Sequence, residues 1–341
     1  MALPIQNNQQ NRPRVIAVVG PTGIGKSSLA QELALSLNTS VLSADSMQIY
    51  RGMDIGTAKL PISERKVPHF GLDLIEPAQT YSAADYQAYG RKLIDSAGSS
   101  SPEAGRQVAP LSVPVVCGGT GLYLRALLDD FNFAGFTEEE QKEQLERRQK
   151  YEGLWEEIGA QGLHDLLAER DLAAAREIHP NNARRTVRAL ELWEAGESYA
   201  QIKKGFKSRV SYYPSLWIGL SCDRASLYQG INARVDKMMT SGLLEEVEGL
   251  LAAGYRSALT AQQAIGYKEL VPVIEQGADL NLAVDAIKQA TRRYAKRQLS
   301  WFRGDQRIEW IQSDGLTTAE IFKKAQRLIS DYNWVNREEE E

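Results

Sequence analysis

The stretch that decides the fold is GPTGIGKSS, residues 20–28, which directly follows the apolar run RVIAVV at residues 14–19. Its glycines and its Gly-Lys-Ser ending match the phosphate-loop spacing. In such a loop the backbone N–H groups at the positive end of a helix face an anion. The alternative, a glycine turn with an exposed lysine, is disfavoured because the apolar run predicts a strand. The spacing of Leu29, Leu33 and Leu37 then predicts a helix over 27–37.

Outward from this loop, the chain alternates between strand-like and helical segments. Further strands are predicted at 41–44, 113–117 and 212–220. Such alternation predicts a parallel sheet that holds ligands at the carboxyl ends of its strands. We therefore predict an α/β fold with a P-loop NTPase-like parallel-sheet core.

Between residues 129 and 211 the strand-like runs disappear and charged amphipathic helices take over. We interpret this segment as an inserted all-helical domain. The predicted organisation is a core of residues 12–128 and 212–330, an insertion of residues 129–211, and an acidic tail of residues 331–341.

Composition narrows the class of protein. The 341 residues carry a net charge of −4, and 43% of them are hydrophobic. The two cysteines, Cys117 and Cys222, lie far apart in apolar stretches, which argues for a reducing compartment and against a disulfide framework or zinc finger. The N-terminal residues lack the apolar core of a signal peptide, and no run reaches membrane-spanning length. We expect a cytoplasmic monomer without a membrane partner.

Charge is distributed unevenly despite the negative total. Residues 184–209 hold seven Lys and Arg against three Glu, and residues 288–307 hold seven against the single Asp305. Local patches, rather than the sign of the net charge, govern contact with phosphates. A nucleic-acid partner is therefore compatible with this composition.

The acidic residues argue against ATP hydrolysis. A P-loop NTPase or kinase normally has an Asp that holds Mg²⁺ at the end of a core strand. Here the strand at 113–117 runs into Gly118-Gly119-Thr120, whereas an acid, Asp45, closes the strand at 41–44. Taken alone, Asp45 could assist a magnesium ion, act as a general base or cap a turn.

A series of motifs resembles the tRNA dimethylallyltransferases, also called tRNA isopentenyltransferases, in its bacterial form. In chain order the motifs are GPTGIGKS, ADSMQIYRGMDIGTAK, PHFGLDL, YSAADY, GGTGLYLRALL, HPNNARRTVRALELW, GLLEEVEGLL, AIGYKEL and RRYAKRQLSWFRG. The resemblance covers residues 14–314, and DSMQIYRGMDIGTAK is far more specific than a phosphate loop. It implies transfer of the dimethylallyl group of dimethylallyl diphosphate to N6 of the adenosine 3′ to the anticodon of tRNA.

The resemblance implies that the phosphate loop binds the diphosphate leaving group of the prenyl donor, and not the phosphates of a nucleotide. The implied diphosphate site comprises Gly20, Pro21, Thr22, Gly23, Ile24, Gly25, Lys26, Ser27 and Ser28. Lys26 would neutralise charge as the allylic C–O bond breaks, and Ser27 would ligate a Mg²⁺ cofactor. The family's general base matches Asp45, which would take the proton that the adenine amine releases. Thr120 would donate a hydrogen bond to the donor, although a helix N-cap is its alternative role.

The resemblance also implies a tRNA surface. Chemistry on a base requires taking it out of the stack, and the family places Asp45, Ser46, Met47 and Gln48 on the extruded adenosine. Gln48 suits an adenine edge, although it could equally be a polar turn residue. The remaining predicted contacts are basic: Lys142, Arg184, Arg185 and Arg188 in the insertion, and Arg292, Arg293, Lys296 and Arg297 near the C-terminus.

Two of these positions depart from the family pattern. Arg184 stands where the family usually has Gln, and Lys142 where it commonly has Arg, so bidentate geometry is lost at Lys142. Without the resemblance, the arginines at 184–188 would be read as a solvated helix face. His69 is interpreted as structural, because no acid or second histidine accompanies it in sequence.

Three other functions remain open on sequence grounds. An adenylate isopentenyltransferase would use the same chemistry on free adenine nucleotides, but the arginine-bearing insertion and the basic helix favour tRNA. A nucleotide kinase is disfavoured by the missing acid after the strand at 113–117. A non-catalytic RNA-binding module would have no use for a complete phosphate loop.

Overall fold

The computed structural model describes residues 12–96, 113–131, 138–205, 209–255 and 261–334. The chain divides into two compact units, one formed by residues 1–129 with 211–341 and the other by residues 130–210. The predicted tail at 331–341 lies largely outside the described residues, which end at Trp334.

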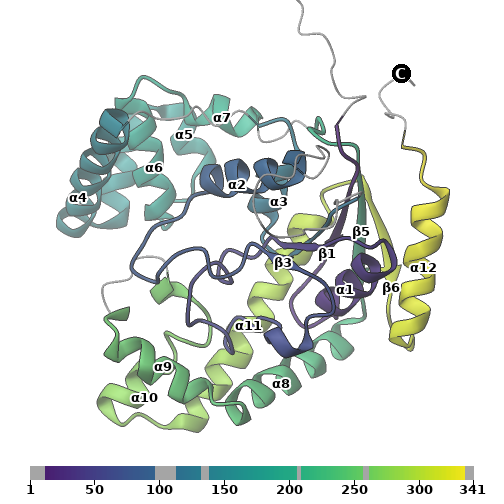
Figure 1. The fold of residues 1–341 in the computed structure, drawn as a ribbon. Coiled ribbons are helices and arrows are strands. Elements are labelled where there is room, and N and C mark those ends of the chain that lie inside the picture. The colour runs from purple at the N-terminus through teal and green to yellow at the C-terminus, as the bar shows by residue number, and fades with distance from the viewer. Residues whose placement is uncertain (1–11, 97–112, 132–137, 206–208, 256–260, 335–341) are drawn as a thin grey trace, which may run out of the picture. The chain divides into compact units, whose positions relative to one another are not determined.

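The larger unit is built on a six-stranded sheet in the order β3-β2-β4-β1-β5-β6, and all its strand pairs are parallel (Figure 1). The strands are β1 (Val15–Val19), β2 (Val41–Ser43), β3 (His69–Phe70), β4 (Val115–Gly118), β5 (Ser215–Ser221) and β6 (Ile308–Gln312). All five residues of β1 are buried, since strands flank it on both sides and helices cover its faces. The parallel sheet confirms the predicted fold class.

The two outermost strands, β3 and β6, were not predicted. β3 has only two residues, and in β6 the apolar residues are interrupted by Glu309. The two residues of β3 are too few to show a pattern, and the mixed apolar and polar residues of β6, at the other edge of the sheet, do not form a continuous apolar run.

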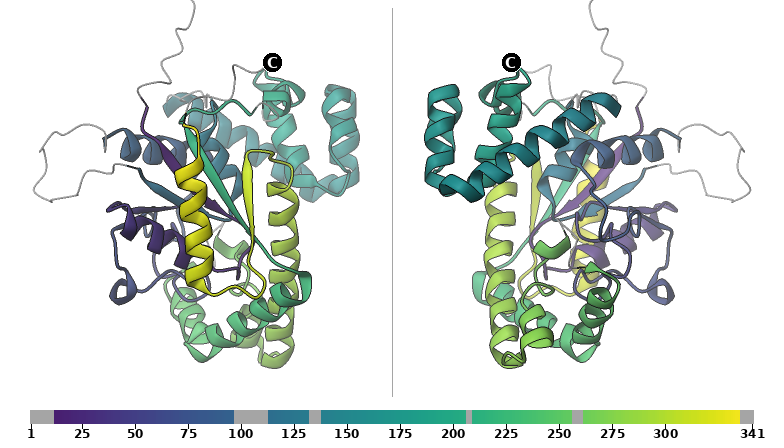
Figure 2. Two further views of the ribbon diagram at one scale, coloured as in Figure 1. Left: turned by 90° about the vertical axis from the view of Figure 1, so that its right-hand side faces the viewer. Right: turned by 90° about the vertical axis from the view of Figure 1, so that its left-hand side faces the viewer.

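Helices cover both faces of the sheet (Figure 2). On one face α1 (Lys26–Ser36) and α12 (Thr318–Asp331) pack against the side chains of Ile16 and Val18. The opposite face of β1, formed by Val15, Ala17 and Val19, shares a core with the other helices of this unit. These helices are α2 (Ala83–Ser96), α3 (Gly121–Leu128), α8 (Arg224–Thr240), α9 (Leu243–Ala252), α10 (Val271–Gln276) and α11 (Leu280–Phe302). None of the helices in the described ranges is long and apolar enough to cross a bilayer.

The smaller unit is helical in its described part. It comprises α4 (Glu138–Arg170), α5 (Leu172–Glu177), α6 (Ala183–Glu194) and α7 (Tyr199–Gly205). Its own apolar core includes Leu163, Leu167 and Leu190. α4 is broken at Gly159, whose φ of 73° lies outside the helical region. Asn182 caps α6, where its side chain accepts a hydrogen bond from the N–H of Arg185.

Candidate active site at the carboxyl ends of the strands

The phosphate loop joins β1 to α1. Gly25, the residue before the helix, has a φ of 94°, a left-handed conformation that glycine adopts without strain. The Lys26 Nζ donates a hydrogen bond of 2.7 Å to the carbonyl of Pro21, so the lysine arches over its own loop. Burial, together with the nearby positive charge of Arg234, lowers the pKa of Lys26 to about 8, against the opposing effect of Asp45. The Lys26 ammonium has a carbonyl partner but no anionic hydrogen-bond partner among the described residues, and an anion that enters the loop would supply one.

Asp45 and Thr120 meet because β2 and β4 are neighbours in the sheet. The N–H of Thr120 donates to the carbonyl of Ala44 at 3.2 Å, just before Asp45. The N–H of Ser46 then donates to Thr120 Oγ1 at 3.1 Å, and one Asp45 carboxylate oxygen accepts the N–H of Met47 at 2.9 Å. Thr120 occupies the N-cap position of α3, but its side chain makes no capping bond. Its hydroxyl is therefore turned toward the Asp45 turn.

Gln298 connects the two glycine loops of the site. Its side-chain oxygen accepts the N–H of Thr22 at 2.8 Å, and its amide nitrogen donates to the carbonyl of Gly119 at 3.0 Å. Only 5% of this residue is exposed. Gln298 was not singled out in the sequence, since it lies 276 residues from Thr22. It fixes the phosphate loop relative to the loop that carries Thr120.

Tyr294 and Arg234 are two further site residues that the sequence did not identify as such. Tyr294 lies beside Thr120 and Gln298, and burial raises its pKa to about 12. Arg234, on α8, has no hydrogen-bond or salt-bridge partner among the described residues, and burial lowers its pKa while the charge of Asp45 opposes that shift. A half-buried guanidinium beside the loop is suited to binding an anion there.

Gln48 is held by protein groups. Its side-chain oxygen accepts a hydrogen bond from Ser43 Oγ at 2.7 Å, and its amide nitrogen donates to the carbonyls of Thr57 at 3.1 Å and Ala58 at 3.4 Å. These bonds favour the turn-forming role over the predicted contact with an adenine edge, because both ends of the amide are engaged. Gln48 ties β2 to the loop at 54–58.

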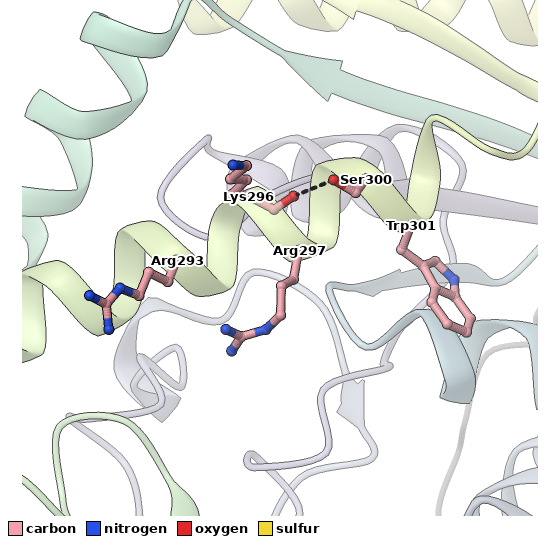
Figure 3. Close-up of a pocket in the computed structure, with 5 residues that line it drawn as sticks. All are labelled: Arg293, Lys296, Arg297, Ser300 and Trp301. Atoms are coloured by element: carbon pink, nitrogen blue, oxygen red, sulfur yellow. Dashed lines mark hydrogen bonds between the residues drawn. The ribbon is translucent and has the colours of Figure 1, made fainter. Parts of the chain in front are cut away.

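The basic helix predicted at 291–303 is the C-terminal half of α11. Arg293, Lys296 and Arg297 are exposed and line one pocket, drawn in Figure 3. Arg292 is separate from them: its guanidinium donates to Asn232 on α8 at 2.7 Å and lies 5.7 Å from the ring centre of Tyr228. The four cations therefore do not form a single face.

In the helical unit, Lys142, Arg184 and Arg185 are exposed on α4 and α6. Arg188 forms a salt bridge of 2.8 Å with Glu191, whose side chain is buried. No group of three or more acidic, histidine or cysteine side chains able to hold a metal occurs in the described ranges.

Comparison with known proteins identifies the family. The model of the IPP transferase family matches residues 48–305, and that of the isopentenyl transferase family matches residues 13–65. The chain is 42% identical to the tRNA dimethylallyltransferase of Carboxydothermus hydrogenoformans, with 91% of this chain and 96% of the relative aligned. It is 43% identical to that of Exiguobacterium sibiricum, over 91% of this chain and 93% of the relative.

Solved structures agree. The tRNA isopentenylpyrophosphate transferase of Bacillus halodurans superposes with a TM-score of 0.65 at 36% identity, covering 94% of this chain and 96% of that one. A eukaryotic dimethylallyltransferase acting on tRNA superposes with a TM-score of 0.70 at 25% identity, covering 95% of this chain and 81% of that one. The identity and the length of these matches lead to one conclusion. The chain belongs to the tRNA dimethylallyltransferase family.

Proposed function

We propose that this protein transfers the dimethylallyl group of dimethylallyl diphosphate to N6 of the adenosine 3′ to the anticodon of tRNA and releases diphosphate. The observation that carries the proposal is the meeting of three elements at the carboxyl ends of the strands. These are an anion-binding loop with Lys26, a carboxylate at Asp45 and a hydroxyl at Thr120. A kinase is disfavoured, since β4 ends in Gly118 and leads into Thr120 without an acid.

The reaction forms one bond and breaks another at the same carbon. N6 of the adenine attacks C1 of the donor, the C1–O bond breaks, and the electron pair leaves with the diphosphate. Lys26, Arg234 and the loop N–H groups stabilise the negative charge that develops on the diphosphate. The Asp45 carboxylate accepts the proton that N6 loses, and the Thr120 hydroxyl donates a hydrogen bond to a donor oxygen.

Magnesium is part of the proposal. Ser27, the second residue of α1, would hold it together with diphosphate oxygens and water. When bound, the ion supplies charge neutralisation for the leaving group. The reaction is proposed to occur in the cytoplasm.

The proposal is tested by incubating the protein with Mg²⁺, labelled dimethylallyl diphosphate and either unmodified tRNA or AMP. We expect label in tRNA and none in AMP. Label in AMP alone would identify an adenylate isopentenyltransferase, and consumption of ATP without transfer would identify a kinase.

The role of Asp45 has its own test. Asp45→Asn retains the size of the side chain and an acceptor for the Met47 N–H, but cannot take a proton. Loss of a general base lowers rates by roughly 100- to 10,000-fold, so we expect kcat for tRNA to fall by that factor. Affinity for pyrophosphate should stay unchanged. An equal loss of affinity and rate would instead make Asp45 a structural residue or a metal ligand.

A further inference from the structure

Three side chains of α11 project from the same side of the helix. Arg293, Arg297 and Trp301 follow one another at intervals of four residues, and Figure 3 shows them along one edge, with Lys296 on the other. They line an open pocket of about 610 Å³ together with Lys296 and Ser300. We call Arg293, Arg297 and Trp301 the α11 stripe.

Trp301 is the apolar member of the stripe. It is 44% exposed, although burying an indole is strongly favourable. Its indole lies against the first turn of α3: a Cβ atom placed on Gly121 would be only 2.0 Å from Trp301 Nε1. Glycine at this position lets the ring lie close to the backbone. The helix thus supports the ring and leaves much of it accessible.

The two arginines of the stripe retain their charge for a ligand. Arg293 and Arg297 are exposed, and neither has an ion-pair partner in the part of the chain that the structure describes. The guanidinium of Arg297 lies 5.5 Å from the ring centre of Tyr294, which contacts Thr120. Two free guanidinium groups beside an accessible indole are suited to an unpaired nucleotide, whose base stacks and whose phosphate is anionic.

We propose that the α11 stripe is a stacking site for one nucleobase of the tRNA loop, a neighbour of the adenosine that reacts. The proposal rests on the proposed function. Trp301 carries the base, and Arg293 and Arg297 bind the phosphates that flank it. Gly121 directly follows Thr120, so the site adjoins the reaction centre. Stacking the neighbour would hold the strand open while the target base is extruded.

The first test measures the affinity of the full-length protein for an unmodified anticodon stem-loop RNA, without the prenyl donor. Trp301→Ala should weaken binding by about 5- to 150-fold, the range that one base–aromatic stack contributes. Trp301→Phe, which retains a ring, should stay within roughly threefold of the unchanged protein. Leu282→Ala, an exposed apolar position near the start of the same helix, serves as the matched control and should change nothing. Unchanged affinity for pyrophosphate shows that each variant is folded.

The second test locates the stacked base. Stem-loops that each lack one base near the target adenosine are compared on the unchanged protein and on Trp301→Ala. At one position, removal of the base should weaken binding to the unchanged protein. The same removal should not weaken binding to Trp301→Ala, because the stacking contact with that base is already absent in the variant. If the variant binds the complete stem-loop as tightly as the unchanged protein, or responds to every missing base in the same way, the proposal is wrong.

The arginines are tested by the salt dependence of RNA binding. Replacing Arg293 and Arg297 by Gln should reduce the slope of log K against log salt by about 1.4, since each phosphate on a single strand contributes about 0.7. The control replaces Lys323 and Lys324, exposed on α12 and therefore on the opposite face of the sheet, and should leave the slope unchanged. If the arginine and the lysine double variants reduce the salt slope equally, Arg293 and Arg297 do not make specific phosphate contacts.

Two outcomes distinguish failure of the stacking proposal from failure of the proposed function. If Trp301→Ala raises KM for dimethylallyl diphosphate and leaves RNA affinity intact, the pocket binds the donor and this inference is wrong. If the unchanged protein modifies AMP and not tRNA, the proposed function itself is wrong.

Discussion

At the scale of single residues, the site combines a carboxylate, a half-buried lysine and a hydroxyl that are distant in sequence. Asp45 and Thr120 are brought together by the parallel pairing of β2 with β4, in which Ser43 lies opposite Cys117. Lys26 approaches the same point from β1, the next strand. The desolvation that lowers the pKa of Lys26 to about 8 also makes its charge sensitive to pH.

The depressed pKa of Lys26 predicts a pH dependence of diphosphate binding. Below pH 8, Lys26 is protonated whether or not diphosphate is bound. Above pH 8, Lys26 loses its proton in the free protein but keeps it when diphosphate is bound, so binding requires taking up a proton. We therefore expect pyrophosphate affinity to fall with rising pH above about 8, by up to tenfold per pH unit. Titration calorimetry at several pH values measures this.

Lys26→Met is the control for that pH dependence. It should bind pyrophosphate roughly 10- to 100-fold more weakly at pH 7, since one charge-assisted hydrogen bond is lost. The pyrophosphate affinity of Lys26→Met should not decline as the pH rises above 8, because the variant has no lysine to deprotonate. The assignment fails if the variant retains the same decline.

At the scale of elements, the loop following the Asp45 turn is fastened to α9 by one carboxylate. Glu246 accepts hydrogen bonds from the N–H groups of Asp54 and Ile55 at 2.9 and 2.8 Å, and from that of Gly56 at 3.1 Å. The hydroxyl of Tyr267 donates to it as well, at 2.6 Å. Because this loop in turn holds Gln48, Glu246 positions the Asp45 turn from a distance.

Glu246→Gln should therefore impair turnover more than ligand binding. The amide has one oxygen and presents an N–H₂ group to backbone donors, so at least one charge-assisted bond of about 1.5–3 kcal/mol is lost. We expect kcat for tRNA to fall by roughly 10- to 100-fold, while pyrophosphate affinity stays constant. Steady-state kinetics measure the split. Glu248→Gln, exposed on the same helix, is the control and should behave like the unchanged protein.

At the scale of the molecule, a buried ionic network secures the larger unit where the helical segment leaves and rejoins it. Asp129 is 1% exposed and accepts hydrogen bonds from Arg125 Nε and Arg307 Nη1, both at 2.6 Å. Arg307 also pairs with Asp305, and these two carboxylates raise its pKa against the effect of burial. Asp129 forms a β-bridge with Ser211, so the two ends of the insertion meet beside the network.

Removing the shared carboxylate should destabilise the whole unit. Asp129→Ala leaves two largely buried arginines without it, and breaking such a pair typically costs about 3–5 kcal/mol. We expect the free energy of unfolding to fall by that amount in urea titrations. Asp130→Ala, one residue away and exposed, should lie within about 0.5 kcal/mol of the unchanged protein. Similar losses in both variants would exclude a specific role for the network.

The amino-acid sequence by itself determined the features that depend on local order. The phosphate loop, the central parallel strands, the helical character of 138–205 and the family-specific motif around Asp45 all follow from short-range spacing. Periodicity and motif carry this information because each depends on neighbouring residues alone.

Only the tertiary structure decided which distant side chains complete the site. Gln298 bridges loops that lie 179 and 276 residues away, and Glu246 reaches a loop about 190 residues away. Arg234, Tyr294 and Trp301 likewise come near the site only when α8 and α11 pack beside the carboxyl ends of the strands. In sequence each looks like an ordinary helix residue, because a helical pattern specifies which face is apolar but not what that face or its edge will meet.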